Sequence, residues 1–338
     1  MKDKISTILK LVISLGIGIG LMYWFIGRMP ESEKIQTWET MKSANIFWLL
    51  SIPFFGFLSN FSRSERWRYL LQSAGYNPGF WNTFFSVMIM YFANLFVPRS
   101  GDVLRCSILA KYEGIPVDKS VGTMVVERIV DLISIVSIGF ILFVGERDKF
   151  LLLFAKKADA GPSSPEMTVI KYIVPVLIVL GIGAFSFYVW KKHGFEKFVN
   201  LVKEKLSGFW HGLQSIRYVK NPAAFIFHSI FVWVCYILMT FIAFKSLPET
   251  ASLDIWAGLA CLFFGGFAMV ATPGGLGVFP ITMKFVLLQF GIAASIGLPY
   301  GLAVWAMQTI SGFVGGILSI GLLLLINRTN PSPIPKEA

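Results

Sequence analysis

Charged residues, cysteine and histidine are all scarce in this chain of 338 residues, and each scarcity excludes a class of protein. Charged side chains make up 14% of the sequence, whereas soluble domains average about 25%. The three cysteines are odd in number and match no disulfide or zinc spacing. The three histidines form no ligand cluster. We therefore expect no soluble domain, no disulfide framework, no metal centre and no cofactor.

Long apolar runs are abundant instead. Hydrophobic residues make up 55% of the chain, and many runs are long enough to cross the roughly 30 Å hydrocarbon core of a bilayer. The nine runs cover residues 5–27, 45–61, 80–97, 120–145, 169–190, 223–244, 253–271, 278–295 and 298–326. A soluble core built from them would leave almost nothing to face water. The sequence predicts an all-α, polytopic integral membrane protein with about seven to nine hydrophobic segments.

One domain accounts for nearly the whole chain. We assign residues 1–327 to a single transmembrane domain and residues 328–338 to a disordered tail. Within the domain, residues 191–221 alternate aromatic and aliphatic positions with Lys and Glu at helical spacing, which is typical of an amphipathic helix in the headgroup layer. Its excess of Lys places this segment in the cytoplasm, and the lysines before the first run place the N-terminus there too.

The cytoplasmic position of residues 191–221 restricts the topology. If all nine runs crossed the bilayer, the run 169–190 would deliver this basic segment to the outside. We therefore expect run 80–97 to enter and return on one side, broken at "VPRSGD" by Pro98 and Gly101. The glycines of "ATPGGLGVFP" (271–280) predict a second re-entrant hairpin from the opposite side. Two opposed broken segments are typical of a transporter binding site.

Six charged residues interrupt the apolar runs: Arg99, Asp102, Arg105, Glu127, Arg128 and Asp131. Their charges sum to zero, and the spacing of four between Glu127 and Asp131 places both on one helix face. One interpretation is an ion-pair network that holds the first hairpin against the helix at 120–145. The other is a substrate site, which we favour because buried charges are costly and apolar packing could fill a structural role.

Further basic residues and glycines are candidates for headgroup contacts. Arg63, Arg66 and Arg68 follow the run 45–61, where they predict either simple interfacial anchoring or a headgroup vestibule. Lys284 is open to the same two interpretations. The glycines of the second break would expose N–H groups before a helix, which suits an anion such as a lipid phosphate; these are Gly274, Gly275 and Gly277.

Three motifs, in their order and spacing, resemble the lysylphosphatidylglycerol synthase transmembrane-region family: "NLFVPRSGDVLR" (94–105), "ERIVD" (127–131) and "PGGLGVF" (273–279). The resemblance covers residues from about 5 to about 326. It implies a flippase-like protein in the inner membrane of a bacterium or archaeon that moves phospholipid or polyprenyl-linked lipid between leaflets. By motif it adds Asn94 to the candidate substrate-binding residues.

Two departures from that family qualify the resemblance. The chain lacks the soluble aminoacyltransferase half, so we do not expect it to synthesise lysyl-lipid. Where many members carry a carboxylate shortly after the glycine motif, this chain has Phe279 and Pro280. We therefore expect Glu127 and Asp131, and not an acid after the glycine motif, to be the functional carboxylates.

The function predicted from the sequence is therefore a lipid flippase or transporter rather than an enzyme. Its expected partners are membrane lipids, in particular anionic phospholipid or lipid phosphate, and not nucleic acid; the net charge of +11 fits contact with anionic headgroups. Two alternatives stay open. A membrane enzyme could use the paired carboxylates for acid–base chemistry, although the sequence has no P-loop. A scaffold could act without moving lipid.

Overall fold

The computed structural model describes residues 31–97, 99–147 and 219–328, together with Gly20, Tyr23 and Gly27. The described segments are α2 (Glu31–Ser43), α3 (Ile46–Leu49), α4 (Ser51–Ser73), α5 (Phe80–Asn94), α6 (Ser100–Glu113), α7 (Val117–Gly145), α11 (Pro222–Ala243), η3 (Phe244–Ser246), α12 (Ile255–Ala271), η4 (Pro273–Gly275), α13 (Val278–Leu288) and α14 (Ala294–Arg328). The predicted all-α class is confirmed. The described residues exclude run 169–190 and Pro98. They also exclude nearly all of run 5–27, nearly all of segment 191–221 and nearly all of the tail.

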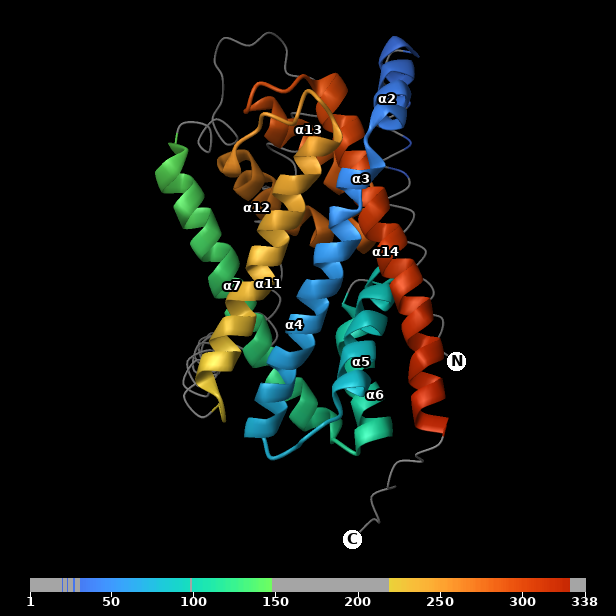
Figure 1. Cartoon of the computed structure of the whole chain (residues 1–338), viewed down its shortest axis with the longest axis vertical. Helices are drawn as coiled ribbons and strands as arrows, with labels where there is room; N and C mark the ends of the chain where they lie inside the picture. The colour runs from blue at the N-terminus through green and yellow to red at the C-terminus, as the bar shows by residue number, and fades with distance from the viewer. Residues whose placement is uncertain are drawn as a thin grey trace, which may run out of the picture.

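The longest described helices, α4, α7, α11 and α14, run along the height of the bundle (Figure 1). Three of them, α7, α11 with η3, and the 35-residue α14, are long and apolar enough to cross a membrane. The fourth, α4, continues from α3 as one segment (Ile46–Ser73), which passes this test only together with α2, from which it is bent by 80°. The second half of α4 carries Arg63, Arg66 and Arg68, and it continues to Ser73, well beyond the predicted run 45–61.

Two helical hairpins enter the bundle from opposite ends (Figure 1). Helices α5 and α6 have 15 and 14 residues, and α12 and α13 have 17 and 11. At 1.5 Å per residue these helices are about 16 to 26 Å long, shorter than the roughly 30 Å core of a bilayer. The α5–α6 hairpin enters and leaves at the lower end and the α12–α13 hairpin at the upper end, as the sequence predicted.

Glycines make the two hairpins possible. At Gly101, a Cβ atom would overlap the backbone carbonyl of Met90, so the absence of a side chain lets α6 pack directly against α5. In the second hairpin, Gly274 and Gly277 have φ angles of 57° and 76°, a left-handed conformation that favours glycine. The hairpin tips meet in mid-bundle, where a Cβ on Gly274 would lie 3.0 Å from Leu95 Cδ2.

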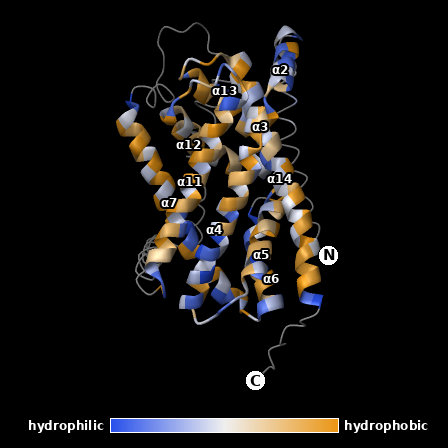
Figure 2. Cartoon of the chain, viewed as in Figure 1, coloured by the Kyte–Doolittle hydropathy of each residue, from blue (hydrophilic) through white to orange (hydrophobic). Residues whose placement is uncertain are grey.

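The apolar residues cover the outside of the bundle as well as its core (Figure 2). Large apolar side chains are exposed along α7, including Val136, Phe140 and Val144, and along α14, including Leu318 and Leu325. A soluble surface would not carry such continuous apolar faces, whereas a bilayer covers them. The structure thus agrees with a multi-pass membrane protein.

Candidate functional site: an arginine–carboxylate cluster at the end of a cavity

Helix α4 turns one polar face into the bundle. Ser59, Ser62, Arg63 and Arg66 follow each other at helical spacing, and all four are buried. Arg63 and Arg66 are only 3% and 0% exposed. Of the two interpretations given for these arginines, their burial argues against simple interfacial anchoring. The same spacing continues the polar face from Ser59 through Arg66, and it is the sequence signal that could have identified them.

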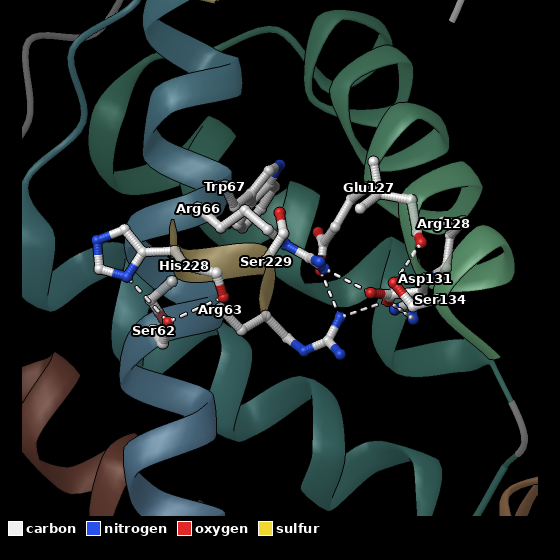
Figure 3. A network of polar contacts seen from close by, with 12 residues as sticks. Ser62, Arg63, Arg66, Trp67, Glu127, Arg128, Asp131, Ser134, His228 and Ser229 are labelled. Atoms are coloured by element: carbon white, nitrogen blue, oxygen red, sulfur yellow. Dashed lines mark hydrogen bonds and ion pairs between the residues drawn. The ribbon is translucent and has the colours of Figure 1, made fainter. Parts of the chain in front are cut away.

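Helix α7 presents two carboxylates to these arginines (Figure 3). Nη1 of Arg63 donates to Glu127 Oε1 at 2.6 Å and to Asp131 Oδ2 at 2.8 Å. Nη2 of Arg66 donates to Asp131 Oδ1 at 2.8 Å and to Glu127 Oε1 at 3.1 Å. The spacing of four residues between the two acids places them one above the other, so each arginine reaches both.

Helix α6 of the first hairpin contributes a third arginine. Nη2 of Arg105 lies 2.9 Å from Glu127 Oε2 and 3.9 Å from Asp102 Oδ1. Its guanidinium lies 4.2 Å from the ring centre of Trp67, a cation–π contact typical of arginine. Trp67 in turn donates through Nε1 to Thr123 Oγ1 at 3.0 Å, which holds α4 against α7.

Arg128 is the most exposed member of the group, with 42% of its side chain accessible. Its Nη2 lies 2.6 Å from Asp102 Oδ1, and its Nη1 lies 3.5 Å from Asp131 Oδ2. We call the seven residues joined by these contacts the ionic cluster: Arg63, Arg66, Asp102, Arg105, Glu127, Arg128 and Asp131. Four guanidinium groups face three carboxylates in this cluster, so its formal charge is +1.

Arg99 does not belong to the ionic cluster, although the sequence analysis placed it there. It is the only non-glycine residue with a positive φ in the described part of the chain, at 63°. It precedes α6 at the tip of the first hairpin, its side chain is exposed, and none of the ion pairs of the cluster includes it. The predicted charge balance of zero was therefore wrong, because Arg63 and Arg66 take part and Arg99 does not.

A cavity of about 730 Å³ opens beside the cluster. Arg63, Arg128 and Asp131 form its charged end, and the hydroxyl groups of Tyr91 and Tyr236 lie next to them. Nη2 of Arg63 donates to Tyr236 at 3.3 Å, and the two hydroxyl groups are 3.4 Å apart. Most of the remaining wall is apolar and comes from α4, α7, α12, α13 and α14. The space is thus charged at one end and largely apolar over the rest.

The other predicted residues lie apart from the cluster. Asn94 accepts a hydrogen bond from the backbone N–H of Gly101 at 2.9 Å, which closes the first hairpin. Arg68 pairs with Glu65 at 2.9 Å. Lys284 belongs to α13, on the second hairpin, beside Phe285. Gly274, Gly275 and Gly277 form the tip of that hairpin.

The cluster is rich in guanidinium groups, which are chemically suited to anions. Guanidinium groups bind phosphate and carboxylate oxygens in a bidentate manner. No group of three His, Cys, Asp or Glu residues suited to a metal ion occurs within residues 31–97, 99–147 and 219–328. Of the six charged residues in the two motifs, five come together in space: Asp102, Arg105, Glu127, Arg128 and Asp131.

Comparison with known proteins places these features in a wider context. Residues 8–316 match the family described as the lysylphosphatidylglycerol synthase TM region. A UPF0104 membrane protein of Methanocaldococcus jannaschii is 22% identical over 280 residues, which cover 75% of this chain and 80% of that protein. The glycosyltransferase AglD of Haloferax volcanii is 24% identical over 303 residues, covering 78% of this chain and 47% of AglD. The chain thus spans about half of AglD. No solved structure matches.

Proposed function

This chain belongs to the lysylphosphatidylglycerol synthase transmembrane-region family, and from that membership and the site geometry we propose that it is a lipid flippase. In this proposal the ionic cluster binds the polar headgroup of a phospholipid or polyprenyl-linked lipid, and the cavity holds the part of the lipid next to it. The lipid then moves between the leaflets with its headgroup inside the protein.

The division of the cavity into a charged and an apolar part is the observation that carries this proposal. A lipid has the same division. Two cavity-lining residues on α7 and α12 are highly exposed: Leu132 is 52% exposed and Phe267 is 57% exposed. We infer from this exposure that the apolar part of the cavity opens toward the bilayer, where acyl chains would remain while the headgroup enters.

Ion-pair exchange gives a physical route for headgroup binding. Arg63 and Arg128 both line the cavity and both pair with Asp131. A phosphate group offers these arginines the same kind of oxygen as the carboxylate does. Replacing one anionic partner with another offsets much of the cost of taking the phosphate out of water. Such an exchange favours a reversible site over a permanent one.

The enzyme alternative fits the cluster less well. Glu127 contacts three arginines (Arg63, Arg66 and Arg105), and Asp131 contacts Arg63, Arg66 and Arg128. A general acid or base has to exchange a proton during turnover, and a carboxylate held by three guanidinium groups is poorly suited to that. The pairing favours binding over acid–base catalysis.

The proposal includes a location, namely the cytoplasmic membrane of a bacterium or archaeon, with the lower end of the bundle in the cytoplasm. The α5–α6 hairpin and Asp118, at the start of α7, lie at this end, and Glu249 follows α11 at the other (Figure 1). A single cysteine replacing the exposed Asp118 would react with a membrane-impermeant thiol reagent only from inside, and one replacing Glu249 only from outside. The reverse pattern would overturn this orientation.

The proposed function is tested by lipid movement in proteoliposomes. The assay follows fluorescent phosphatidylglycerol in the wild type, in Arg63→Gln/Asp131→Asn, and in Lys119→Gln, which removes one exposed positive charge from α7 outside the cluster. The double variant removes a pair and strands no partner, so we expect a folded protein whose rate falls at least about tenfold, or about 1.4 kcal/mol. Lys119→Gln should match the wild type.

Three outcomes would contradict this proposal. Wild-type rates in the folded double variant would show that the cluster is dispensable for movement. Absence of movement by the wild type, with the headgroup chemically altered in the recovered lipid, would support the enzyme alternative. Absence of both movement and turnover would support a scaffold.

A further inference from the structure

We propose that the ionic cluster selects lipids by headgroup charge, and that its preferred ligand is a phosphodiester lipid with one negative charge. This inference rests on the proposed function, because it concerns the same site. It goes further by predicting that zwitterionic lipids and phosphomonoester lipids bind less well. The net charge of the cluster, rather than any one contact, sets this preference.

The excess of one positive charge is the first observation behind this inference. Among the residues that the structure describes, no fourth carboxylate joins the three in the cluster. The nearby acids on the same helices have other partners: Glu65 pairs with Arg68 on α4, and Glu113 accepts from Asn82 Nδ2 at 2.6 Å at the far end of α6. The positive charge is thus a property of the site.

Burial makes this excess charge costly. Arg66 and Arg105 are fully buried, and Arg63 is nearly so. Several of their N–H groups, including Nε of Arg63 and Nη1 of both Arg66 and Arg105, have no hydrogen-bond acceptor within the described ranges. Buried charges and buried donors normally have partners. An anion at the charged end of the cavity would supply the missing negative charge, and its oxygens would be acceptors for Arg63.

The size of the excess determines which headgroup matches. A phosphodiester carries one negative charge and neutralises the cluster. A zwitterionic headgroup brings no net charge and leaves the excess in place. A phosphomonoester carries about −1.5 to −2 charges at neutral pH, which would leave negative charge next to Asp131 and Asp102. Charge matching therefore ranks the phosphodiester anion first.

Variants of the Arg128–Asp102 pair can distinguish an effect of the net charge of the cluster from an effect of one specific contact. It lies on the more exposed side of the cluster, at 2.6 Å, and water can solvate either side chain when its partner is lost. Removing Arg128 alone brings the cluster charge to zero, and removing Asp102 alone raises it to +2. Removing both leaves +1, as in the wild type.

The experiment is a lipid competition on the full chain in detergent, read by native mass spectrometry. The competitors are dioleoyl phosphatidylglycerol, phosphatidylcholine and phosphatidic acid, which share their acyl chains. We expect the wild type to prefer phosphatidylglycerol over each of the others by about tenfold. Arg128→Gln should lose the preference over phosphatidylcholine, and Asp102→Asn should favour phosphatidic acid. The double variant should restore the wild-type order, and Lys119→Gln should keep it.

The double variant is the decisive arm. If it ranks the lipids as Arg128→Gln does, a specific contact of Arg128 sets the preference and the inference is wrong. The inference is also wrong if all the variants rank the lipids as the wild type does, because the ranking would then not depend on the charge of the cluster. Lipid movement in proteoliposomes without any charge ranking would leave the proposed function standing and reject only the inference. Charge-dependent binding without movement would do the opposite.

Discussion

The two hairpins share one architecture and differ in their chemistry. Each consists of two helices too short to cross the bundle, joined at mid-height, and each depends on glycine at or beside its tip. Yet α6 brings Asp102 and Arg105 into the ionic cluster. The second hairpin contributes apolar cavity wall, including Leu262, Phe279 and Met283.

This difference shows how a pseudo-symmetric frame can produce an asymmetric site. Opposed hairpins bring two tips to the centre of the bundle, where irregular backbone is shielded from lipid. The ionic cluster, which the first hairpin joins through Asp102 and Arg105, and the apolar wall of the second hairpin then give the cavity a charged end and an apolar end. The predictions below test this division, beginning with the charged side.

The largest effect is expected from Glu127→Gln. This change leaves Arg63, Arg66 and Arg105 with one anionic partner fewer inside the bundle, and breaking a buried pair typically costs about 3–5 kcal/mol. The folded yield and the melting temperature in detergent should both fall strongly. By contrast, Met283→Leu, a volume-conserving change in the second hairpin, should cost less than about 1.5 kcal/mol.

The matched control for Glu127→Gln is Ser137→Ala, because Ser137 lies on the same helix, is exposed, and donates only to the Ile133 carbonyl. It should melt as the wild type does. If Glu127→Gln also melted at the wild-type temperature, the buried ion pairs would not be what holds α4, α6 and α7 together.

The packing of the first hairpin is tested by Gly101→Ala. Its Cβ would meet the backbone of Met90, which cannot move without displacing α5, so we expect a loss of about 1–3 kcal/mol. Gly122→Ala is the control, since nothing lies within 4 Å of its Cβ position on α7; it should be neutral or gain up to about 1 kcal/mol from helix propensity. Equal melting temperatures for the two variants would contradict the close approach of α5 and α6.

The smallest effects are expected at the hydrogen bonds that close the two tips. Asn94 accepts from Gly101 N in the first hairpin, and Trp305 donates through Nε1 to the Gly274 carbonyl at 2.8 Å in the second. Asn94→Ala and Trp305→Phe should each destabilise the fold by about 1 kcal/mol. Neither should change the ranking of headgroups, because neither residue belongs to the ionic cluster. A changed ranking in Asn94→Ala would mean that this residue also contacts the lipid.

Hydropathy and helical spacing predicted most of the described fold. The apolar runs, the two breaks and the entry of the hairpins from opposite ends follow from local sequence, because Pro and Gly interrupt helices in a known way. Glu127 and Asp131 were predicted to share a helix face because they are four residues apart. What local sequence does not contain is which helices meet, and the errors in the predicted site arise there.

Arg63, Arg66 and Arg99 illustrate those errors. Hydropathy ended the second run at residue 61 because charges follow it, although α4 continues and pairs its arginines with acids on α7. Arg99 is adjacent in sequence to the charged motif, but the left-handed turn before α6 leaves its side chain exposed. The glycine turn, in contrast, forms the tip of the second hairpin as predicted, and its role as an anion site stays a prediction.

The central claim is that the headgroup lies at the ionic cluster and the acyl chains lie along the second hairpin. Photocrosslinking tests it with two versions of phosphatidylglycerol, one with a diazirine on the headgroup and one with a diazirine on an acyl chain. Peptide mapping should place headgroup crosslinks on α4, α7 and α11 around Arg63, Asp131 and Tyr236, and acyl crosslinks on α12, α13 and α14. Headgroup crosslinks confined to α12 and α13, with acyl crosslinks around Arg63, would contradict the account.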